Sequence, residues 1–535
     1  MRTLYQLIIL LAVCAFLFLF GLGKMALTDP DETFYAQTAS EMFESDEWVT
    51  PMIFGKPQFE KPVLYYWLIM LSYKTFGISE FSARLPSVVF AMGGIIGIYL
   101  IGRVMFSPLC GFLSGLIMAT SVLYQVLARG CVTDMVLTVF IIFCFLFFIL
   151  AWISGKKAYY LLSAIMAGFA VLTKGPIGLM IPGAVIGLYV ITGGRWRSLK
   201  DVPIVLSILV FLAVCLPWYV LVAKVHGSTF IDEFFGFHNI MRFMEPEHRI
   251  GSSAFYNIPV IMVGFFPWSA FLPLGAWFLY RKDDFISRLD SHRLFLGLWV
   301  LTIFLFFSVS RTKLPTYIFP LFPAIAIMTG RFWESFIRDA GKGREAAVTV
   351  FMDLSYYLYL FLGIASLAGV FFVIKYRYPQ AINPVVLCET VFALGTILSA
   401  VFFWARKRLF LFSTITLTAV LMVIPLVTLV LPIIETFESS KILSHRFEEL
   451  AKDTEPVGGE CDHRRGVAFY TGRTEVEDIH PYHKLLQFIS REERVWGIIQ
   501  VKHYNQVKES RGDLYMEPVF ESGKYVLITN KPYER

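Results

Sequence analysis

The chain has 535 residues, of which 56% are hydrophobic and only 16% are charged. A soluble protein carries roughly a quarter charged residues and lacks repeated apolar runs of about 20 residues, so this composition excludes a soluble enzyme, a disordered protein and a disulfide scaffold. The net charge of +6 is small for this length and does not indicate a nucleic-acid-binding protein.

Thirteen apolar runs approach the length of about 17–25 residues that spans a bilayer. A further run at 62–76 is interrupted by polar neighbours and is interpreted as a re-entrant or interfacial segment. With the N-terminus in the cytoplasm, Lys and Arg concentrate in the cytoplasmic loops, as the positive-inside rule requires, and the C-terminus lies outside. The predicted spans are 5–27, 84–102, 109–127, 132–153, 158–173, 176–192, 203–224, 255–280, 294–310, 314–330, 354–375, 384–405 and 409–434.

Residues 437–535 differ from the rest of the chain because charged residues and His become more frequent. Strand-like runs are predicted at Gly466–Thr471, Arg494–Val501 and Tyr525–Thr529. The chain is therefore predicted to be an all-α polytopic membrane protein over residues 1–436, followed by a small extramembrane α/β domain over 437–535.

Two external segments are long, 28–83 and 225–254, and both carry candidate site residues. In the first, Asp29 is a suitable N-cap, Pro30 suits the first helical position, and Asp31 and Glu32 follow in the first turn. A well-capped helix start explains these residue types without catalysis. A carboxylate pair at the membrane boundary is also a candidate site for acid–base chemistry.

Further ionisable residues lie at the external ends of the spans, where a buried charge is costly unless it is paired or binds a ligand. Simpler interpretations exist, since Lys61 or Lys174 could snorkel to the interface, Arg84 could anchor a span, and Arg129 could pair with Asp134. Their common side of the membrane nevertheless favours a shared site for an anionic head group such as a phosphate. The set comprises Asp31, Glu60, Lys61, Asp134, Lys174, His238, Arg242, Arg311, Lys313 and Tyr317.

Nucleotide-binding motifs are missing from the sequence. It contains neither a GxxxxGKS/T loop nor a strand–GxGxxG–helix unit, so no nucleotide cofactor is expected. An enzyme that faces away from the cytoplasm would also lack nucleotide donors. A phosphate-linked lipid donor is compatible with both observations.

Several motifs in the first 330 residues resemble one known family. The segments PDETFYAQTASEM, DEWVTP, FEKPVLYYW and ARLPS resemble the opening of the lipid A aminoarabinose transferase family. RGCVTDMVL, TKGPIG, HNIMRF, FFPW and KLPTYIFP continue the resemblance in order. That family belongs with the GT-C glycosyltransferases, beside the protein O-mannosyltransferases. The resemblance implies a GT-C fold with about 13 transmembrane helices in the bacterial inner membrane and a periplasmic C-terminal domain.

The implied activity is transfer of a sugar, such as 4-amino-4-deoxy-L-arabinose, from a polyprenyl carrier such as undecaprenyl phosphate. The acceptor is expected to be lipid A or another glycan or lipid, reached from the periplasmic side. Two alternatives stay open: a protein O-mannosyltransferase-like enzyme, and a transporter of lipid-linked sugars. A transporter should place polar groups near the bilayer midplane and show repeats. The clustering of charges at one face favours the enzyme.

The resemblance also implies residue roles. Asp31 and Asp134 match two important aspartates of the family, and Glu32, the second carboxylate of the pair at the helix start, completes the predicted catalytic set. Glu60 and His238 are the predicted ligands of a divalent ion such as zinc or magnesium, although HNIMRF departs from the family's acidic-His pairing. The predicted substrate- and phosphate-binding residues are Lys61, Arg242, Tyr317, Lys174, Arg84 and Lys313.

Overall fold

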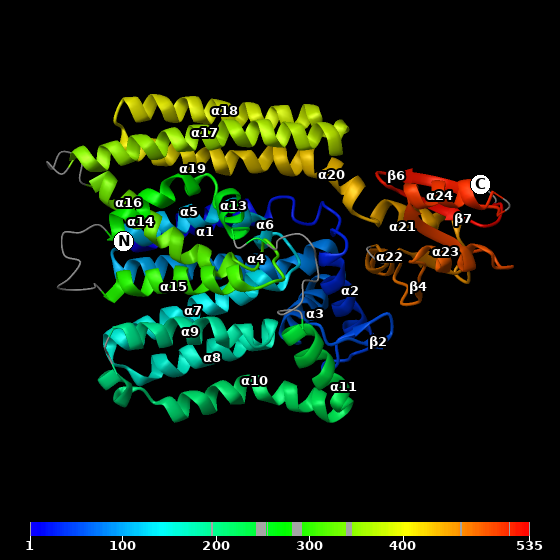
Figure 1. Ribbon diagram of the computed structural model, residues 1–535, viewed down its shortest axis with the longest axis horizontal. Coiled ribbons are helices and arrows are strands. Elements are labelled where there is room, and N and C mark those ends of the chain that lie inside the picture. The colour runs from blue at the N-terminus through cyan, green and yellow to red at the C-terminus, as the bar shows by residue number, and fades with distance from the viewer. Residues whose placement is uncertain are drawn as a thin grey trace.

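The computed structural model describes residues 2–193, 196–241, 253, 255–280, 291–338, 345–460, 463–512 and 514–533. Long helices lie side by side in a bundle, and a smaller sheet-containing unit projects from one end of it (Figure 1). We call this unit, from Lys441 to the last described residue, the C-terminal unit.

Each predicted span overlaps a helix or a run of helices, although the span predicted at 314–330 begins eight residues before α16 (Phe322–Arg338). By length and apolar composition, seven helices in the described part of the chain can cross a membrane, or up to nine if each of two bent pairs is counted as one span. The chain is therefore a mostly helical, multi-pass membrane protein. The bundle helices are α1 (Arg2–Leu19), α4 (Glu80–Met105), α5 (Pro108–Ala119), α6 (Val122–Ala128), α7 (Thr133–Ser154), α8 (Lys157–Lys174), α9 (Ile177–Thr192), α10 (Ile204–His226), α13 (Asn257–Gly264), α14 (Leu272–Tyr280), α15 (Ser291–Val309), α16 (Phe322–Arg338), α17 (Glu345–Arg377), α18 (Ile382–Trp404), α19 (Arg408–Pro425) and α20 (Leu431–Glu438).

Short helical segments connect several of these helices. The π-helix η2 (Asp232–Met241) follows the short helix α11 (Ser228–Ile231) beyond α10. The others are η1 (Trp196–Asp201), η3 (Trp268–Phe271), η4 (Phe319–Leu321), η5 (Pro379–Ala381) and η6 (Leu426–Val430).

Two of the predicted spans are bent rather than straight. The α5–α6 pair bends by 72° and the α13–α14 pair by 112°. The two breaks contact each other, since the Trp268 indole donates to the Thr120 hydroxyl at 2.9 Å and the Val122 N–H donates to the Phe266 carbonyl at 3.3 Å. These bonds satisfy polar groups that the breaks expose, which a membrane interior requires.

The first external segment folds onto the end of the bundle. It contains α2 (Asp31–Glu44), a hairpin of β1 (Met52–Ile53) and β2 (Lys56–Pro57), and α3 (Leu64–Phe76). The run predicted to be re-entrant or interfacial is α3, which packs against α2, α4 and α8. Tyr35, Tyr65 and Tyr66 are buried where α2 meets α3. This packing fixes the start of α2 against the bundle.

The C-terminal unit contains a five-stranded sheet in the order β4-β3-β5-β7-β6. β3 pairs in parallel with β4 and β5, whereas β7 pairs antiparallel with β5 and β6. The strand predicted at Gly466–Thr471 is wrong, because this run belongs to α22; parallel neighbours such as β3 and β4 need a crossover, usually a helix. The elements are α21 (Lys441–Leu450), β3 (Val457–Gly459), α22 (Arg464–Thr471), β4 (Val476–Asp478), α23 (Tyr482–Ile489), β5 (Trp496–Gln500), α24 (Val501–Ser510), β6 (Glu517–Ser522) and β7 (Tyr525–Thr529).

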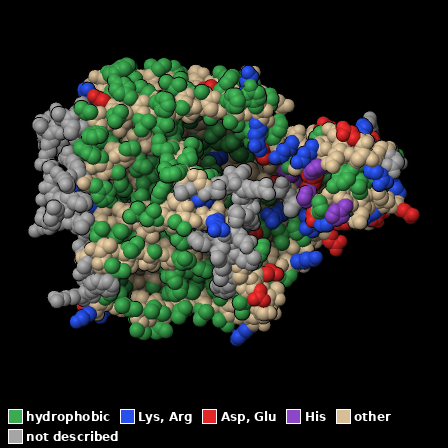
Figure 2. All heavy atoms as spheres, viewed as in Figure 1, with side chains coloured by type: hydrophobic (Ala, Val, Ile, Leu, Met, Phe, Trp, Pro, Cys, Tyr) green, Lys and Arg blue, Asp and Glu red, His purple; other side chains and the backbone are tan. Residues whose placement is uncertain are grey.

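The bundle exposes hydrophobic side chains over most of the visible face, and charged side chains gather where it meets the C-terminal unit (Figure 2). Phe361, Ile364, Leu394 and Ile397 on α17 and α18 are each more than half exposed. An apolar surface of this extent is stable in lipid and would aggregate in water. The charged junction therefore marks where the protein leaves the hydrocarbon region.

Candidate functional site at the junction of the bundle and the C-terminal unit

Asp31 is the first residue of α2, and its side chain is open at the surface of the junction. The Asp31 carboxylate accepts no side-chain hydrogen bond and forms no ion pair with any residue that the structure describes. The surrounding protein partly desolvates this carboxyl, which raises its pKa, and the carboxylates of Asp134 and Glu60 raise it further. Arg465 of the C-terminal unit opposes this rise. Asp31 is thus an available carboxylate with raised basicity.

Asp29 does not cap α2, so the predicted N-cap is wrong. Pro30 precedes the helix without a side-chain cap, and the Asp29 side chain is directed to the C-terminal unit instead. Its carboxylate accepts hydrogen bonds from the Ser440 N–H at 3.0 Å and hydroxyl at 2.8 Å, and pairs with His463 Nδ1 at 2.7 Å. The carboxylate is fully buried in these contacts. Asp29 therefore joins the two parts of the chain.

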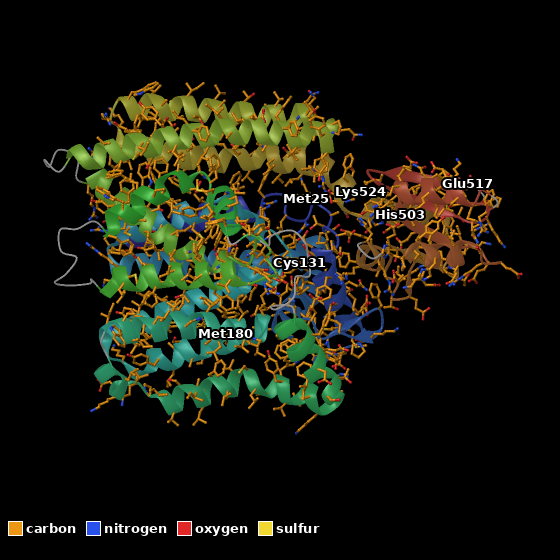
Figure 3. The ribbon with its side chains drawn as sticks, viewed as in Figure 1. Met25, Cys131, Met180, His503, Glu517 and Lys524 are labelled. Atoms are coloured by element: carbon orange, nitrogen blue, oxygen red, sulfur yellow. The ribbon has the colours of Figure 1, made fainter. Side chains whose placement is uncertain are left out.

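Glu32 and Arg84 form a buried ion pair rather than an open site. Arg84 donates through Nε at 2.8 Å and Nη2 at 2.6 Å to the two carboxylate oxygens, and both side chains are less than 10% exposed. Cys131 N–H donates to the same carboxylate at 2.8 Å, and Arg84 also donates to the Met25 carbonyl at 2.7 Å. Figure 3 places Met25 and Cys131 at the end of the bundle that faces the C-terminal unit.

The surroundings of Glu32 decide its charge. Burial alone disfavours a carboxylate, but Arg84 outweighs this cost and lowers the pKa of Glu32. Because every hydrogen-bonding group of the pair is satisfied locally, this arrangement favours a structural role for Glu32 and Arg84 over the predicted catalytic and phosphate-binding roles.

Asp134, Lys174 and Tyr317, three of the predicted site residues, lie together in the folded chain. Lys174 Nζ donates to Asp134 Oδ1 at 2.7 Å and lies 4.9 Å from the centroid of the Tyr317 ring. The alternative Arg129–Asp134 pair is wrong, because Arg129 donates to the Leu17 carbonyl at 2.9 Å. A carboxylate, an ammonium and a phenol from α7, α8 and the segment after α15 are thus grouped together.

Glu60 and Lys61 form an adjacent ion pair at 3.2 Å in the loop before α3. Within the described ranges, no group of three His, Cys, Asp or Glu side chains could hold a metal ion. His238 lies in η2 but its side chain is outside the described residues, and Arg242 is outside them entirely. The predicted metal site at Glu60 and His238 therefore stays a prediction, because the side chain of His238 lies outside the described residues.

The remaining predicted cations differ in environment. Lys313 is buried, and its ammonium donates to the backbone carbonyl of Ser253 at 3.0 Å. Arg311 is exposed.

Comparisons with known proteins bear on the family and the fold of the chain. The family model described as dolichyl-phosphate-mannose-protein mannosyltransferase matches residues 60–220. Undecaprenyl phosphate-alpha-4-amino-4-deoxy-L-arabinose arabinosyl transferases from Enterobacter sp. and Edwardsiella ictaluri are 33% and 30% identical over 61% and 59% of this chain. A crystal structure of ArnT from Cupriavidus metallidurans, bound to undecaprenyl phosphate, superposes with a TM-score of 0.80 at 22% identity, covering 98% of each chain. The chain has the ArnT fold.

The resemblance found in the sequence is therefore confirmed. The matched region spans 59% and 57% of the length of these two transferases. The ArnT fold shared over nearly the whole chain includes the C-terminal unit, in which sequence reasoning found no motif.

Arg465 is a residue of this ArnT-like junction that sequence reasoning missed. Its guanidinium lies 4.6 Å from the centroid of the Phe34 ring on α2. No local signal in RRGVAFYT could indicate this contact, because the partners are separated by most of the chain.

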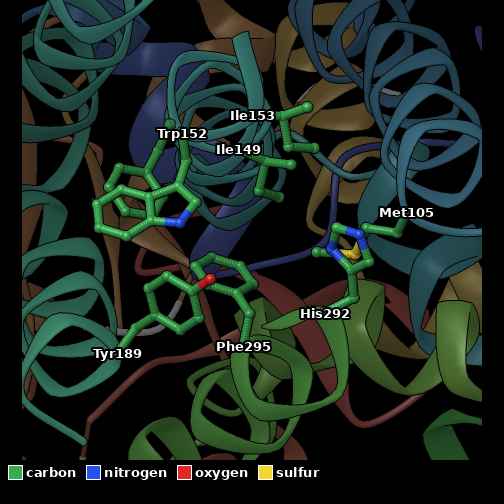
Figure 4. Close-up of a pocket in the computed structure, with 8 residues that line it drawn as sticks. Met105, Ile149, Trp152, Ile153, Tyr189, His292 and Phe295 are labelled. Atoms are coloured by element: carbon green, nitrogen blue, oxygen red, sulfur yellow. The ribbon is translucent and has the colours of Figure 1, made fainter. Parts of the chain in front are cut away.

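A pocket at the opposite end of the bundle has a different character (Figure 4). It is lined mainly by hydrophobic side chains at the ends of α4, α7, α9 and α15, and it includes none of the predicted site residues. The lining residues are Met105, Phe148, Ile149, Trp152, Ile153, Tyr189, His292 and Phe295. The ionisable groups at the junction therefore remain the candidate site.

Proposed function

We propose that the protein transfers a sugar from an undecaprenyl phosphate carrier to lipid A, or to another glycan or lipid acceptor, at the periplasmic face of the bacterial inner membrane. The observation that carries this proposal is the open carboxylate of Asp31 near the carboxylates of Asp134 and Glu60, which are themselves paired with Lys174 and Lys61, in a chain with the ArnT fold. The names of the related transferases and the undecaprenyl phosphate bound to the ArnT relative support the donor and the sugar.

The residues have distinct parts in this reaction. The leaving group is a lipid phosphate, and Lys61, with Arg242 outside the described residues, would stabilise its growing negative charge. Fixed cations in a water-poor site are effective at this. Lys174 and Tyr317 would hold the same phosphate, while Asp134 keeps Lys174 in place at 2.7 Å.

Asp31 acts on the acceptor or on the sugar. If the acceptor is a hydroxyl, Asp31 is the general base, a contribution of roughly 10²–10⁴-fold in rate. If the acceptor is a phosphate that is already anionic, Asp31 orients it and stabilises positive charge on the sugar. A divalent ion at Glu60 and His238 stays a prediction, and dialysis against a chelator followed by a transfer assay tests it.

We also propose that all thirteen predicted spans cross the membrane, with residues 1–436 as the membrane domain and 437–535 as a periplasmic domain. The correspondence between the predicted spans and the helices supports this count. A reporter that is active only outside the cytoplasm, fused after Arg535, should be active. A cytoplasmic reporter signal at this position would overturn the topology.

A protein O-mannosyltransferase-like activity is the second candidate, because the matching family model carries that description. The two candidates differ in acceptor. Mass spectrometry of lipid A from cells with and without the protein should show a pentose-amine addition only when it is present. Unmodified lipid A together with glycosylated periplasmic protein would favour the second candidate.

The site itself is tested with the purified protein and an undecaprenyl-phosphate-linked sugar. Lys61→Ala should lose most transfer while its melting temperature stays close to that of the wild type. Lys56→Ala is the matched control. Lys56 is exposed in β2, and its substitution removes the same charge from the same external segment. Normal transfer by Lys61→Ala would show that Lys61 only anchors the loop at the interface.

A further inference from the structure

The C-terminal unit is attached directly to the start of α2. Besides the buried Asp29 contacts with Ser440 and His463, the Leu27 N–H donates to the Tyr470 hydroxyl at 2.6 Å. Lys441 also pairs with Glu80 at 2.6 Å. These bonds join α21 and α22 to the loop before α2 and to the first turn of α4. We call them the junction contacts.

Gly466 allows the closest approach within the junction. A Cβ atom at this position would lie 2.3 Å from an Asp29 carboxylate oxygen and 2.2 Å from the Ser440 hydroxyl. Contacts this short do not occur, so only glycine fits here. The first turn of α22 is therefore held against the start of α2 by a fit that tolerates no side chain.

Arg465 lies between two residues of this fixed turn, His463 and Gly466. Its guanidinium stacks on the Phe34 ring, one turn along α2 from Asp31. It is half-buried and makes no hydrogen bond or ion pair with any residue in the described parts of the chain. A guanidinium has five N–H donors, so Arg465 presents donors that the described protein does not use.

Arg465 differs in this from Lys61 and Lys174, the described cations proposed to bind the phosphate. Lys61 is paired with Glu60 and Lys174 with Asp134. Arg465 attracts the Asp31 carboxylate electrostatically, yet the two are not within ion-pair distance of 4.0 Å. The planar fork of an arginine matches phosphate oxygens and binds them in a bidentate manner.

We propose that Arg465 is a phosphate-binding residue that the C-terminal unit supplies to the active site. The ring of Phe34 and the junction contacts hold its guanidinium in place. The ligand is a phosphate group of a lipid substrate, and both the carrier and a phosphorylated acceptor have one. This inference rests on the proposed function for the identity of the reaction, but not for the binding of phosphate.

The test uses full-length protein in nanodiscs with Arg465→Gln, Arg465→Lys and Arg446→Gln. Arg446 is the matched control, because it is exposed on α21 of the same unit and pairs with nearby Glu449. Two arms are measured: binding of undecaprenyl phosphate, and the KM for a lipid A acceptor in transfer. Arg465→Gln should weaken one arm by about 10- to 100-fold, the loss typical of a charge-assisted hydrogen bond. Arg465→Lys should recover part of it, and Arg446→Gln should match the wild type.

The arm that changes identifies the source of the phosphate. Unchanged values in both arms for Arg465→Gln would overturn the inference while leaving the proposed function intact. A wild type that transfers no sugar would overturn the proposed function. Undecaprenyl phosphate binding would then still test whether Arg465 binds a phosphate. A wild type that binds neither lipid phosphate overturns both.

A pH profile separates a role at the site from a role in folding. Asp31 faces Arg465 on α22, Asp134 on α7, Glu60 before α3 and its neighbour Glu32. Removing the Arg465 charge should move the acid limb of transfer to higher pH, and Arg465→Lys should leave it close to the wild-type position. An unmoved limb together with unchanged values in both arms for Arg465→Gln would show that Arg465 only packs on Phe34.

Discussion

The helix bundle and the C-terminal unit meet at the first turn of α2. Two adjacent carboxylates lie there, and each faces a different one of these two regions. Glu32 points into the bundle, where Arg84 and backbone donors satisfy it completely. Asp31 faces the junction with the C-terminal unit, where no described residue donates to its side chain. The comparison teaches that residue type and position in the sequence do not decide the role here. The role follows from whether the surrounding protein leaves the carboxylate available.

The largest change in stability is expected for the bundle side of this comparison. Glu32→Gln leaves the Arg84 guanidinium buried without its counter-charge, and breaking a buried pair costs about 3–5 kcal/mol. The variant should show a lower melting temperature and poor recovery from the membrane. Its double variant with Arg84→Met, which removes both charges, should recover part of that stability. A Glu32→Gln protein that melts normally but transfers no sugar would return Glu32 to the predicted catalytic set.

The largest change in activity is expected on the junction side. Asp31→Asn keeps the shape of the side chain but removes its charge and basicity, so transfer should fall by about 10²-fold or more. The melting temperature and undecaprenyl phosphate binding should stay close to wild type, because no described residue depends on the Asp31 carboxylate. Transfer at a normal rate would mean that Asp31 is only a favourable residue at a helix N-terminus.

Disturbing the junction contacts should have a smaller effect, which is on the local stability of the C-terminal unit. Gly466→Ala forces a methyl group against Asp29 and Ser440, and overpacking of this sort costs about 1–3 kcal/mol. Hydrogen exchange should become faster in α21 and α22 and stay unchanged in the bundle. Gly369→Ala on α17 is the control, since a Cβ there meets nothing within 4 Å. Unchanged exchange in α22 would show that the C-terminal unit is held by other contacts.

The sequence predicts the bundle better than the junction for a physical reason. An apolar run must cross the bilayer wherever it occurs, so the spans follow from local composition. Besides the nearby Thr33 hydroxyl, the Asp29 carboxylate has partners 411 and 434 residues away, and no local pattern indicates these. A capped helix start was therefore the natural prediction for Asp29, and a strand was the natural prediction for the apolar run in α22.

The candidate site divides in the same way. Sequence reasoning placed Asp134, Lys174 and Tyr317 on one side of the membrane, and in the folded chain they lie together, while their roles in the reaction stay predictions. It assigned Glu32 and Arg84 to the reaction because their types and side of the membrane are right. Only the hydrogen bonds of the folded chain show that these two satisfy each other, and only the packing of α22 on α2 reveals Arg465.

Acidification should protonate Asp31 and Glu32 at different pH values, so their roles can be separated within one protein. The pKa of Asp31 is raised above its usual 3.8, so the ionised form destabilises the fold slightly and becomes protonated early as the pH falls. The pKa of Glu32 is lowered from 4.5, so its contribution to stability is full above the unfolded value and is lost only as the pH falls through the lower folded value. Acidification should therefore remove activity before it removes the stability that depends on Glu32.

The measurement is transfer and melting temperature across the same pH series, with return to pH 7 after each step. Transfer should decline at a pH above the usual aspartate range while the melting temperature changes little, and activity should return on neutralisation. Asp31→Asn should show no such limb in its residual transfer, because it has no proton to gain at that position. If transfer and melting temperature fall together and Asp31→Asn keeps the same limb, the acid sensitivity belongs to the Glu32–Arg84 pair or to another part of the fold. The open and the satisfied carboxylate would then not be functionally distinct.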